Sequence, residues 1–168
     1  AESMLLPHFI RSKFPELYQR YITILGVNGR HAHRLSPLIE KLCLPTLVIT
    51  DLDAAEKEGY HKSVVPKRGE GLISGNYAIA KWLMKEKDID KLVDYSEDKK
   101  EFSFASPYRF SIRLAYQTPV KVDFEGEEKE AIPGTFEDCL IYTNYDLFKK
   151  IKVTDSGNLV QQTHDLLN

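Results

Sequence analysis

The chain has 168 residues, which favours one domain large enough to bury a core. Apolar residues make up 42% and charged residues 29%, as in ordinary soluble proteins. The formal net charge of −2 argues against a uniformly basic nucleic-acid-binding protein, although a local basic patch can still meet phosphate. No apolar run approaches the ~20 residues of a membrane span, and no signal peptide is visible. We therefore expect a cytoplasmic protein with no membrane partner.

The first half of the chain is predicted to alternate helix and strand. Residues 2–14 have the spacing of a helix, and residues 21–27 are the β-branched and aromatic run of a strand. A second helix is predicted to face the core through apolar residues at i, i+3, i+4 and i+7: Leu35, Leu38, Ile39 and Leu42. The apolar run 45–50 then predicts a strand inside a parallel sheet covered on both faces. Residues 21–50 therefore predict a βαβ unit.

The second half continues with mixed elements. In order, we expect a polar loop over 54–72, helices over 77–86 and 88–94, a one-sided strand over 109–122, an exposed or hairpin-like loop over 125–134, a helix over 135–151 and the start of a last helix over 157–168. Ser74 or Asn76 is available as the N-cap of the first of these helices, and Thr135 as that of the third. Cys43 and Cys139 lack CxxC spacing, so neither a disulfide nor a zinc site is expected.

Two carboxylates, Asp51 and Asp53, follow the strand 45–50 directly. Ligands of open α/β sheets bind beyond the carboxyl ends of the strands, where the turn 28–30 is also expected. If the chain stays extended, both acids point to the same side and repel each other unless a cation neutralises them. Such oxygen ligands suit Mg²⁺, Mn²⁺ or Ca²⁺ rather than zinc. The alternative is a solvated loop start, and the spacing alone leaves both readings open.

Three α/β families carry acids at such a strand end. Haloacid-dehalogenase-type phosphatases use DxDx(T/V), which Ala55 does not match, and response-regulator receivers place their paired acids elsewhere. Toprim domains combine a strand-end Glu with a later DxD. The stretch "ILGVNGRHAHRLSPLIEKLCLPTLVITDLDA" resembles the toprim domain of the OLD (overcoming lysogenization defect) family of nucleases. "SGNYAIAKWL", "RLAYQTPV" and "GTFEDCLIYTN" extend this resemblance, in the right order, over nearly the whole chain.

The resemblance implies a toprim-like (Rossmann-like) parallel sheet flanked by helices, with an added C-terminal strand and helical segment. It implies that Asp51, Asp53 and Glu2 are catalytic metal ligands, with Glu2 as the second acid of an "EGxxE" motif that begins before Ala1. Glu137 corresponds to a late acid that ligates a metal or supports the site, although an acid in a first helical turn also favours the helix dipole. Ser74 and Asn76 correspond to a Ser/Thr-Asn motif with a structural role.

The family also has a catalytic lysine downstream of the late acid. Lys149, Lys150 and Lys152 lie nearby but give no clear counterpart, and the motif is expected beyond Asn168. We therefore expect residues 1–168 to be a single toprim-like domain, a fragment of a larger ATPase-nuclease truncated at both ends.

The implied function is a metal-dependent DNA endonuclease that hydrolyses phosphodiester bonds by a two-metal mechanism. The implied cofactors are Mg²⁺ or Mn²⁺, with Ca²⁺ as a non-productive occupant, and ATP only through a linked ATPase domain. The implied partners are DNA, an ABC/AAA-type ATPase domain in the same parent chain or complex, and further copies in a homo-oligomer. The alternative is a non-catalytic toprim-like module that docks on an ATPase subunit.

Basic residues flank the expected site and are candidates for contacts with DNA phosphates. They are Arg30, His31, Arg34, Lys62, Lys67 and Arg68. A solvated helix end for the first three and a solvated loop for the others are the alternatives.

Overall fold

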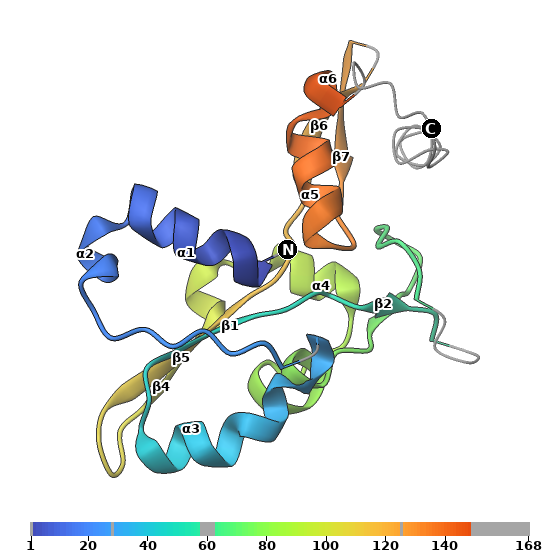
Figure 1. The fold of residues 1–168 in the computed structure, drawn as a ribbon. Coiled ribbons are helices and arrows are strands. Elements are labelled where there is room, and N and C mark those ends of the chain that lie inside the picture. The colour runs from blue at the N-terminus through green and yellow to red at the C-terminus, as the bar shows by residue number, and fades with distance from the viewer. Residues whose placement is uncertain (1, 28, 58–62, 125, 149–168) are drawn as a thin grey trace.

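The computed structural model describes residues 2–27, 29–57, 63–124 and 126–148. Helices surround a small central sheet, and a separate group of two strands and two helices projects from it (Figure 1). Among these residues no helix has the length and apolar character needed to cross a membrane.

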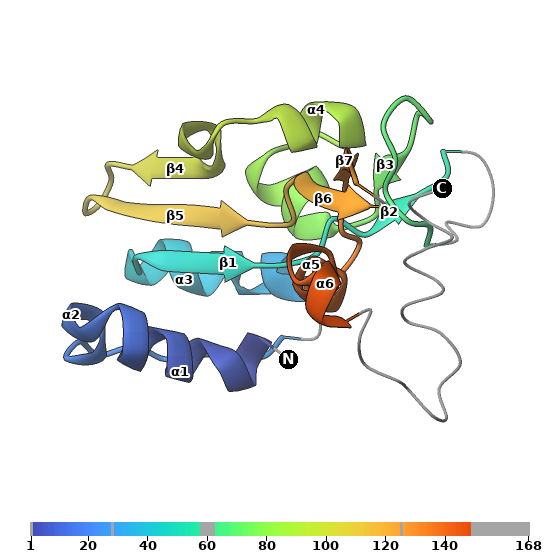
Figure 2. The ribbon, with the colours of Figure 1, turned by 90° about the horizontal axis from the view of Figure 1, so that it is seen from above.

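The central sheet has three strands in the order β1 (Thr46–Ile49), β5 (Phe110–Ala115) and β4 (Glu101–Phe104). β1 and β5 are parallel, whereas β4 and β5 are antiparallel. The expectation of a parallel sheet is therefore corrected to a small mixed sheet. β1 and β5 point toward the same side of the molecule, where β2, β3 and α5 lie (Figure 2).

Burial along the strands follows their place in the sheet. β5 buries Phe110, Ile112 and Leu114 on one face, as predicted from their alternation. β1 buries Val48 but leaves Leu47 56% exposed. The prediction of a strand covered on both faces is wrong for β1, because Leu47 and Ile49, which share one face of the strand, are both exposed.

The predicted strand over residues 21–27 does not form, and the βαβ unit over 21–50 is wrong in consequence. These residues have no strand partner, and Tyr21 and Leu25 are exposed. β-branched residues favour an extended backbone, but a strand also needs a hydrogen-bonded neighbour. The parallel partner of β1 is instead β5, which comes some sixty residues later in the chain.

Two helices were predicted in the first half of the chain, and both are present, as α1 (Glu2–Lys13) and α3 (Ser36–Leu42). The structure adds the short α2 (Pro15–Tyr18) and the 3₁₀-helix η1 (Gly29–Leu35), which were not predicted. α3 buries Ile39, but Leu38 and Leu42 are more than half exposed. The apolar stripe predicted to face the core is therefore only partly buried.

Residues 54–57 and 63–100 form the layer that adjoins the acidic strand end. Its elements are β2 (Ala54–Ala55), β3 (Ile73–Ser74), the π-helix η2 (Ala78–Leu83), α4 (Ile89–Asp94) and the 3₁₀-helix η3 (Glu97–Lys100). β2 pairs antiparallel with β3, so the predicted loop 54–72 begins with a short strand. Helices were predicted over 77–86 and 88–94, and both are present, the first as a π-helix. π-Helical turns are rare and occur frequently at functional sites.

The projecting group consists of β6 (Val120–Phe124), β7 (Glu127–Ala131), α5 (Phe136–Thr143) and α6 (Tyr145–Phe148). β6 and β7 form an antiparallel hairpin, so the hairpin alternative is confirmed, and the predicted strand 109–122 is divided between β5 and β6. This group has its own small core, separate from the main one. Thr135 caps α5 as predicted, in a capping box with Asp138. Both cysteines are free, and the predicted last helix lies outside the described residues.

Candidate active site

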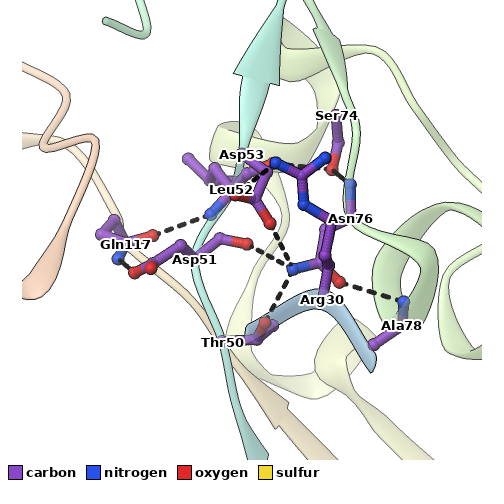
Figure 3. Close-up of polar contacts among 9 residues, drawn as sticks. All are labelled: Arg30, Thr50, Asp51, Leu52, Asp53, Ser74, Asn76, Ala78 and Gln117. Carbon is purple, nitrogen blue, oxygen red and sulfur yellow. Dashed lines mark hydrogen bonds and ion pairs between the residues drawn. The ribbon is translucent and has the colours of Figure 1, made fainter. Parts of the chain in front are cut away.

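Asp51 and Asp53 lie just beyond the carboxyl end of β1, on either side of a fully buried Leu52. Burial of Leu52 in the main core anchors this short segment. Asp53 has a φ of +49°, so the chain does not stay extended there. The two carboxylates consequently have different neighbours: Asp51 reaches Gln117, and Asp53 faces Asn76 and Arg30 (Figure 3).

Asn76 is the centre of the hydrogen-bond network at this strand end. It is fully buried, and its amide Nδ2 lies 2.8 Å from Oδ2 of Asp53, 2.7 Å from Oγ1 of Thr50 and 3.0 Å from the carbonyl oxygen of Asp51. Its Oδ1 accepts a 3.0 Å hydrogen bond from the backbone N–H of Ala78. Asn76 thus joins the acidic segment to the start of η2. This contact satisfies a backbone donor at the start of η2, although the N-cap residue of η2 is Tyr77 and not Asn76 as predicted.

Gln117, just past the end of β5, holds the other acid. Its Nε2 donates to Oδ1 of Asp51, and its Oε1 accepts a 3.0 Å hydrogen bond from the backbone N–H of Leu52. Sequence reasoning quoted the "RLAYQTPV" stretch but gave Gln117 no role. Its position one residue after the buried Tyr116 at a second strand end was the available signal.

Ser74 and Gly75 fix the backbone of the acidic segment from β3. The hydroxyl of the buried Ser74 donates a 2.7 Å hydrogen bond to the carbonyl oxygen of Leu52. The backbone N–H of Gly75 donates to the carbonyl oxygen of Asp53 over 2.8 Å. A Cβ at Gly75 would come within 3.3 Å of that same oxygen, so the close approach favours glycine. Four residues, Ser74, Gly75, Asn76 and Gln117, therefore define where the two acids lie.

A cavity of about 250 Å³ opens beside Asp53. Among its walls are Arg30, Lys81 and Lys87. An Nη2–Oδ1 distance of 3.7 Å separates Arg30 from Asp53, whose side chain is 22% exposed. The site therefore combines a partly accessible carboxylate with an adjoining cationic surface.

The metal-binding roles of the other two predicted ligands, Glu2 and Glu137, stay predictions. Glu2 is the first residue of α1, and Glu137 is exposed on α5 in the projecting group. Within residues 2–27, 29–57, 63–124 and 126–148, no three or more acidic, histidine or cysteine side chains form a group that could hold a metal ion. The two aspartates nevertheless suit a Mg²⁺-type ion, which proteins commonly bind through one or two carboxylates while it keeps several waters.

The predicted DNA-contacting residues fall into separate places. Arg30 lines the cavity beside Asp53, whereas His31 and Arg34 follow it in η1. Nδ1 of His31 is buried without a partner in the described part of the chain.

Arg68 forms ion pairs of 2.8 Å with Asp94 and 2.6 Å with Glu130. The exposed Lys67 adjoins it, lining a second cavity against β7. Lys62, like Lys149, Lys150 and Lys152, lies outside the described residues.

A small mixed sheet with paired acids beyond a parallel strand is consistent with a toprim-like fold. Residues 1–53 match the family described as "Overcoming lysogenization defect protein-like, TOPRIM domain", which confirms the family resemblance over that stretch. The matched region ends on Asp53 and includes both acids.

A curated relative extends the similarity to nearly the whole chain. Over 171 residues the sequence is 25% identical to Endonuclease GajA of Bacillus cereus (strain HuB5-5), and the match covers 98% of this chain. The chain spans 22% of the length of that relative. No solved structure gives a significant match.

Proposed function

We propose that this chain is the nuclease domain of a metal-dependent DNA endonuclease, with Asp51 and Asp53 as metal ligands. One observation carries the proposal: both acids are held beyond the end of β1 by Asn76 and Gln117, beside a cationic cavity. The toprim family match and the endonuclease relative agree with this function. In the proposal, Glu2 is a further acid of the metal site, and Glu137 supports that site.

A divalent ion held by these acids would polarise a phosphodiester and supply an activated water, and two such ions would serve the attacking and leaving oxygens. The chain itself supplies fixed geometry and charge. Asn76 and Gln117 donate hydrogen bonds to the two carboxylates, which fixes the positions of these carboxylates as ligands. Arg30 places a cation next to Asp53, where it offsets the charge of the acid and attracts phosphate.

Nicking of supercoiled plasmid DNA in Mn²⁺ tests this assignment in the complete protein. We expect Asp51→Asn and Asp53→Asn each to lower the nicking rate by about 100-fold or more, because metal assistance is worth several kcal/mol of transition-state stabilisation. Asp98→Asn is the matched control, since Asp98 is an exposed acid on η3 with no part in the site. Nicking that survives both substitutions would refute the assignment.

A docking module without catalytic activity is the second candidate function. The contact between Arg30 and Asp53 favours it, because a cation of the chain already lies against one face of the carboxylate. A docking module predicts that the complete protein, with its ATPase partner present, shows no Mn²⁺-dependent nicking above that of the Asp51→Asn variant.

A further inference from the structure

The cavity beside Asp53 has an excess of positive charge. Three cationic residues, Arg30, Lys81 and Lys87, line it together with a single carboxylate, that of Asp53. The rest of its wall is formed by neutral residues, among them Ser63 and Ser74. The walls come from η1, the segment after β1, β3 and η2, which are far apart in sequence and meet at this strand end.

Lys81 and Lys87 have no carboxylate partner in the described part of the chain, in contrast to Arg68. The ammonium group of Lys81 lies 4.3 Å from the centre of the Tyr77 ring and forms no ion pair there. Arg30, by contrast, lies next to Asp53 and offsets that charge. The two lysines are therefore the uncompensated cations of the cavity.

The backbone around Lys87 is fixed. Its carbonyl oxygen accepts a 2.6 Å hydrogen bond from the backbone N–H of Ser74, and its own N–H donates to Glu86 over 2.8 Å. The carboxylate of Glu86 also accepts from the backbone N–H of Asp88 and pairs with Lys91 at 3.3 Å. Glu86 is thus engaged with its own turn and with Lys91, which leaves the charge of Lys87 available to a ligand.

The size of the cavity indicates what it accepts. At about 250 Å³ it is smaller than the ~300–1,000 Å³ typical of pockets that enclose a whole small molecule. It suits one anionic group of a larger ligand that continues along the surface. A phosphodiester group meets this requirement, and Lys and Arg are the usual partners of such groups.

We propose that Lys81 and Lys87, with Arg30, bind a backbone phosphate of DNA adjacent to the one cleaved at Asp51 and Asp53. The identity of the ligand as DNA rests on the proposed nuclease function. The lysines act as binding and positioning residues: they fix the register of the strand and take no part in bond breaking. Neutralising them therefore weakens DNA binding even where no metal is present.

The test measures binding of a fluorescent DNA duplex to the complete protein in EDTA, over a series of salt concentrations. For Lys81→Gln/Lys87→Gln we expect affinity to fall at least fivefold and the slope of log K against log salt to decrease by about 0.9 per lost phosphate contact. Lys13→Gln/Lys99→Gln removes two exposed lysines elsewhere and controls for net charge. An affinity and salt slope equal to those of this control would overturn the proposal.

Two further measurements separate the possible failures. Competition by low-millimolar inorganic phosphate at constant ionic strength would show a site for free phosphate and would also overturn the proposal for DNA. Asp51→Asn is measured alongside: if it leaves nicking unchanged while the lysine pair still lowers metal-free affinity, the nuclease assignment fails and the phosphate site stands. If nicking depends on Asp51 but the lysine pair behaves like its control, the nuclease assignment stands and the proposed phosphate site fails.

Discussion

The side-chain amide of Asn76 donates a 2.8 Å hydrogen bond to the carboxylate of Asp53. Asn76 is fully buried and also contacts Thr50 and the backbone of Asp51, so one side chain bonds to three residues of the acidic segment. The segment is held by the layer that contains β3 and η2, not by β1 alone.

Asn76→Ala is expected to destabilise the protein by about 2–4 kcal/mol, because it leaves several buried polar groups without partners. Urea denaturation followed by circular dichroism measures this change. Asn144→Ala is the control: Asn144 is exposed, and its amide bonds only the end of α5. A change in the free energy of unfolding as small as that of the control would show that the Asn76 network adds little.

Gln117→Leu is expected to lower the nicking rate by about 10–100-fold, in line with the loss of other residues that orient a metal ligand. Its effect on stability is smaller, at about 1 kcal/mol, because Gln117 is only partly buried. The distinguishing measurement is the Mn²⁺ dependence of nicking, which we expect to shift to higher metal concentration. An unchanged Mn²⁺ requirement would mean that Gln117 does not position Asp51.

Gly75→Ala is expected to cost about 1–2 kcal/mol, since its Cβ would press on the carbonyl oxygen of Asp53. Gly26→Ala is the matched control, because a Cβ at Gly26 meets no atom within 4 Å. We expect that control to be neutral or slightly stabilising. Thermal melting of the two variants measures the difference in stability between them. Equal melting temperatures would show that a Cβ at Gly75 does not press on the carbonyl oxygen of Asp53.

Glu97 contributes stability that depends on pH. It lies 2.9 Å from the ammonium of the buried Lys100 and 2.9 Å from Arg113, and the two cations hold the pKa of Glu97 below its ordinary value of 4.5. A carboxyl group whose pKa is lowered by folding stabilises the folded state fully at pH values above its ordinary pKa. This stabilisation is lost as the pH falls through the lowered pKa of the folded state.

Glu97→Gln should therefore destabilise the protein near neutral pH, and the deficit should shrink as the solution is acidified below pH 4.5. Its size near neutrality is about 1–2 kcal/mol, limited by solvent screening because the Glu97 side chain is 63% exposed. Urea denaturation at several pH values measures it, with Asp98→Asn as the neighbouring control. A stability deficit of Glu97→Gln that grows on acidification would contradict the lowered pKa of Glu97.

The pattern of apolar and capping residues along the sequence was enough to predict several parts of the fold and of the site. The alternation of Phe110, Ile112 and Leu114 predicted β5, and Thr135 predicted the start of α5. The position of Asp51 and Asp53 after β1 was also correct. In each case the signal lies within a few neighbouring residues, where spacing and capping chemistry act.

The parts that were missed depend on distant segments. Residues 21–27 have the composition of a strand, but strand formation requires a partner, and β1 pairs with β5 instead. The positive φ of Asp53 removed the same-side arrangement that an extended chain would give. Gln117 and Lys87 reach the site only through tertiary packing, so no spacing in the sequence links them to the acids.

Metal binding by the two aspartates is the central claim, and thermal melting in Mn²⁺ tests it most directly. A ligand at 100 times its dissociation constant stabilises the folded state by about 2.7 kcal/mol, so we expect the melting temperature of the complete protein to rise with Mn²⁺. The Asp51→Asn/Asp53→Asn variant is expected to show no such rise. An equal rise in both proteins, or none in the unmodified protein, would contradict the assignment of Asp51 and Asp53 as metal ligands.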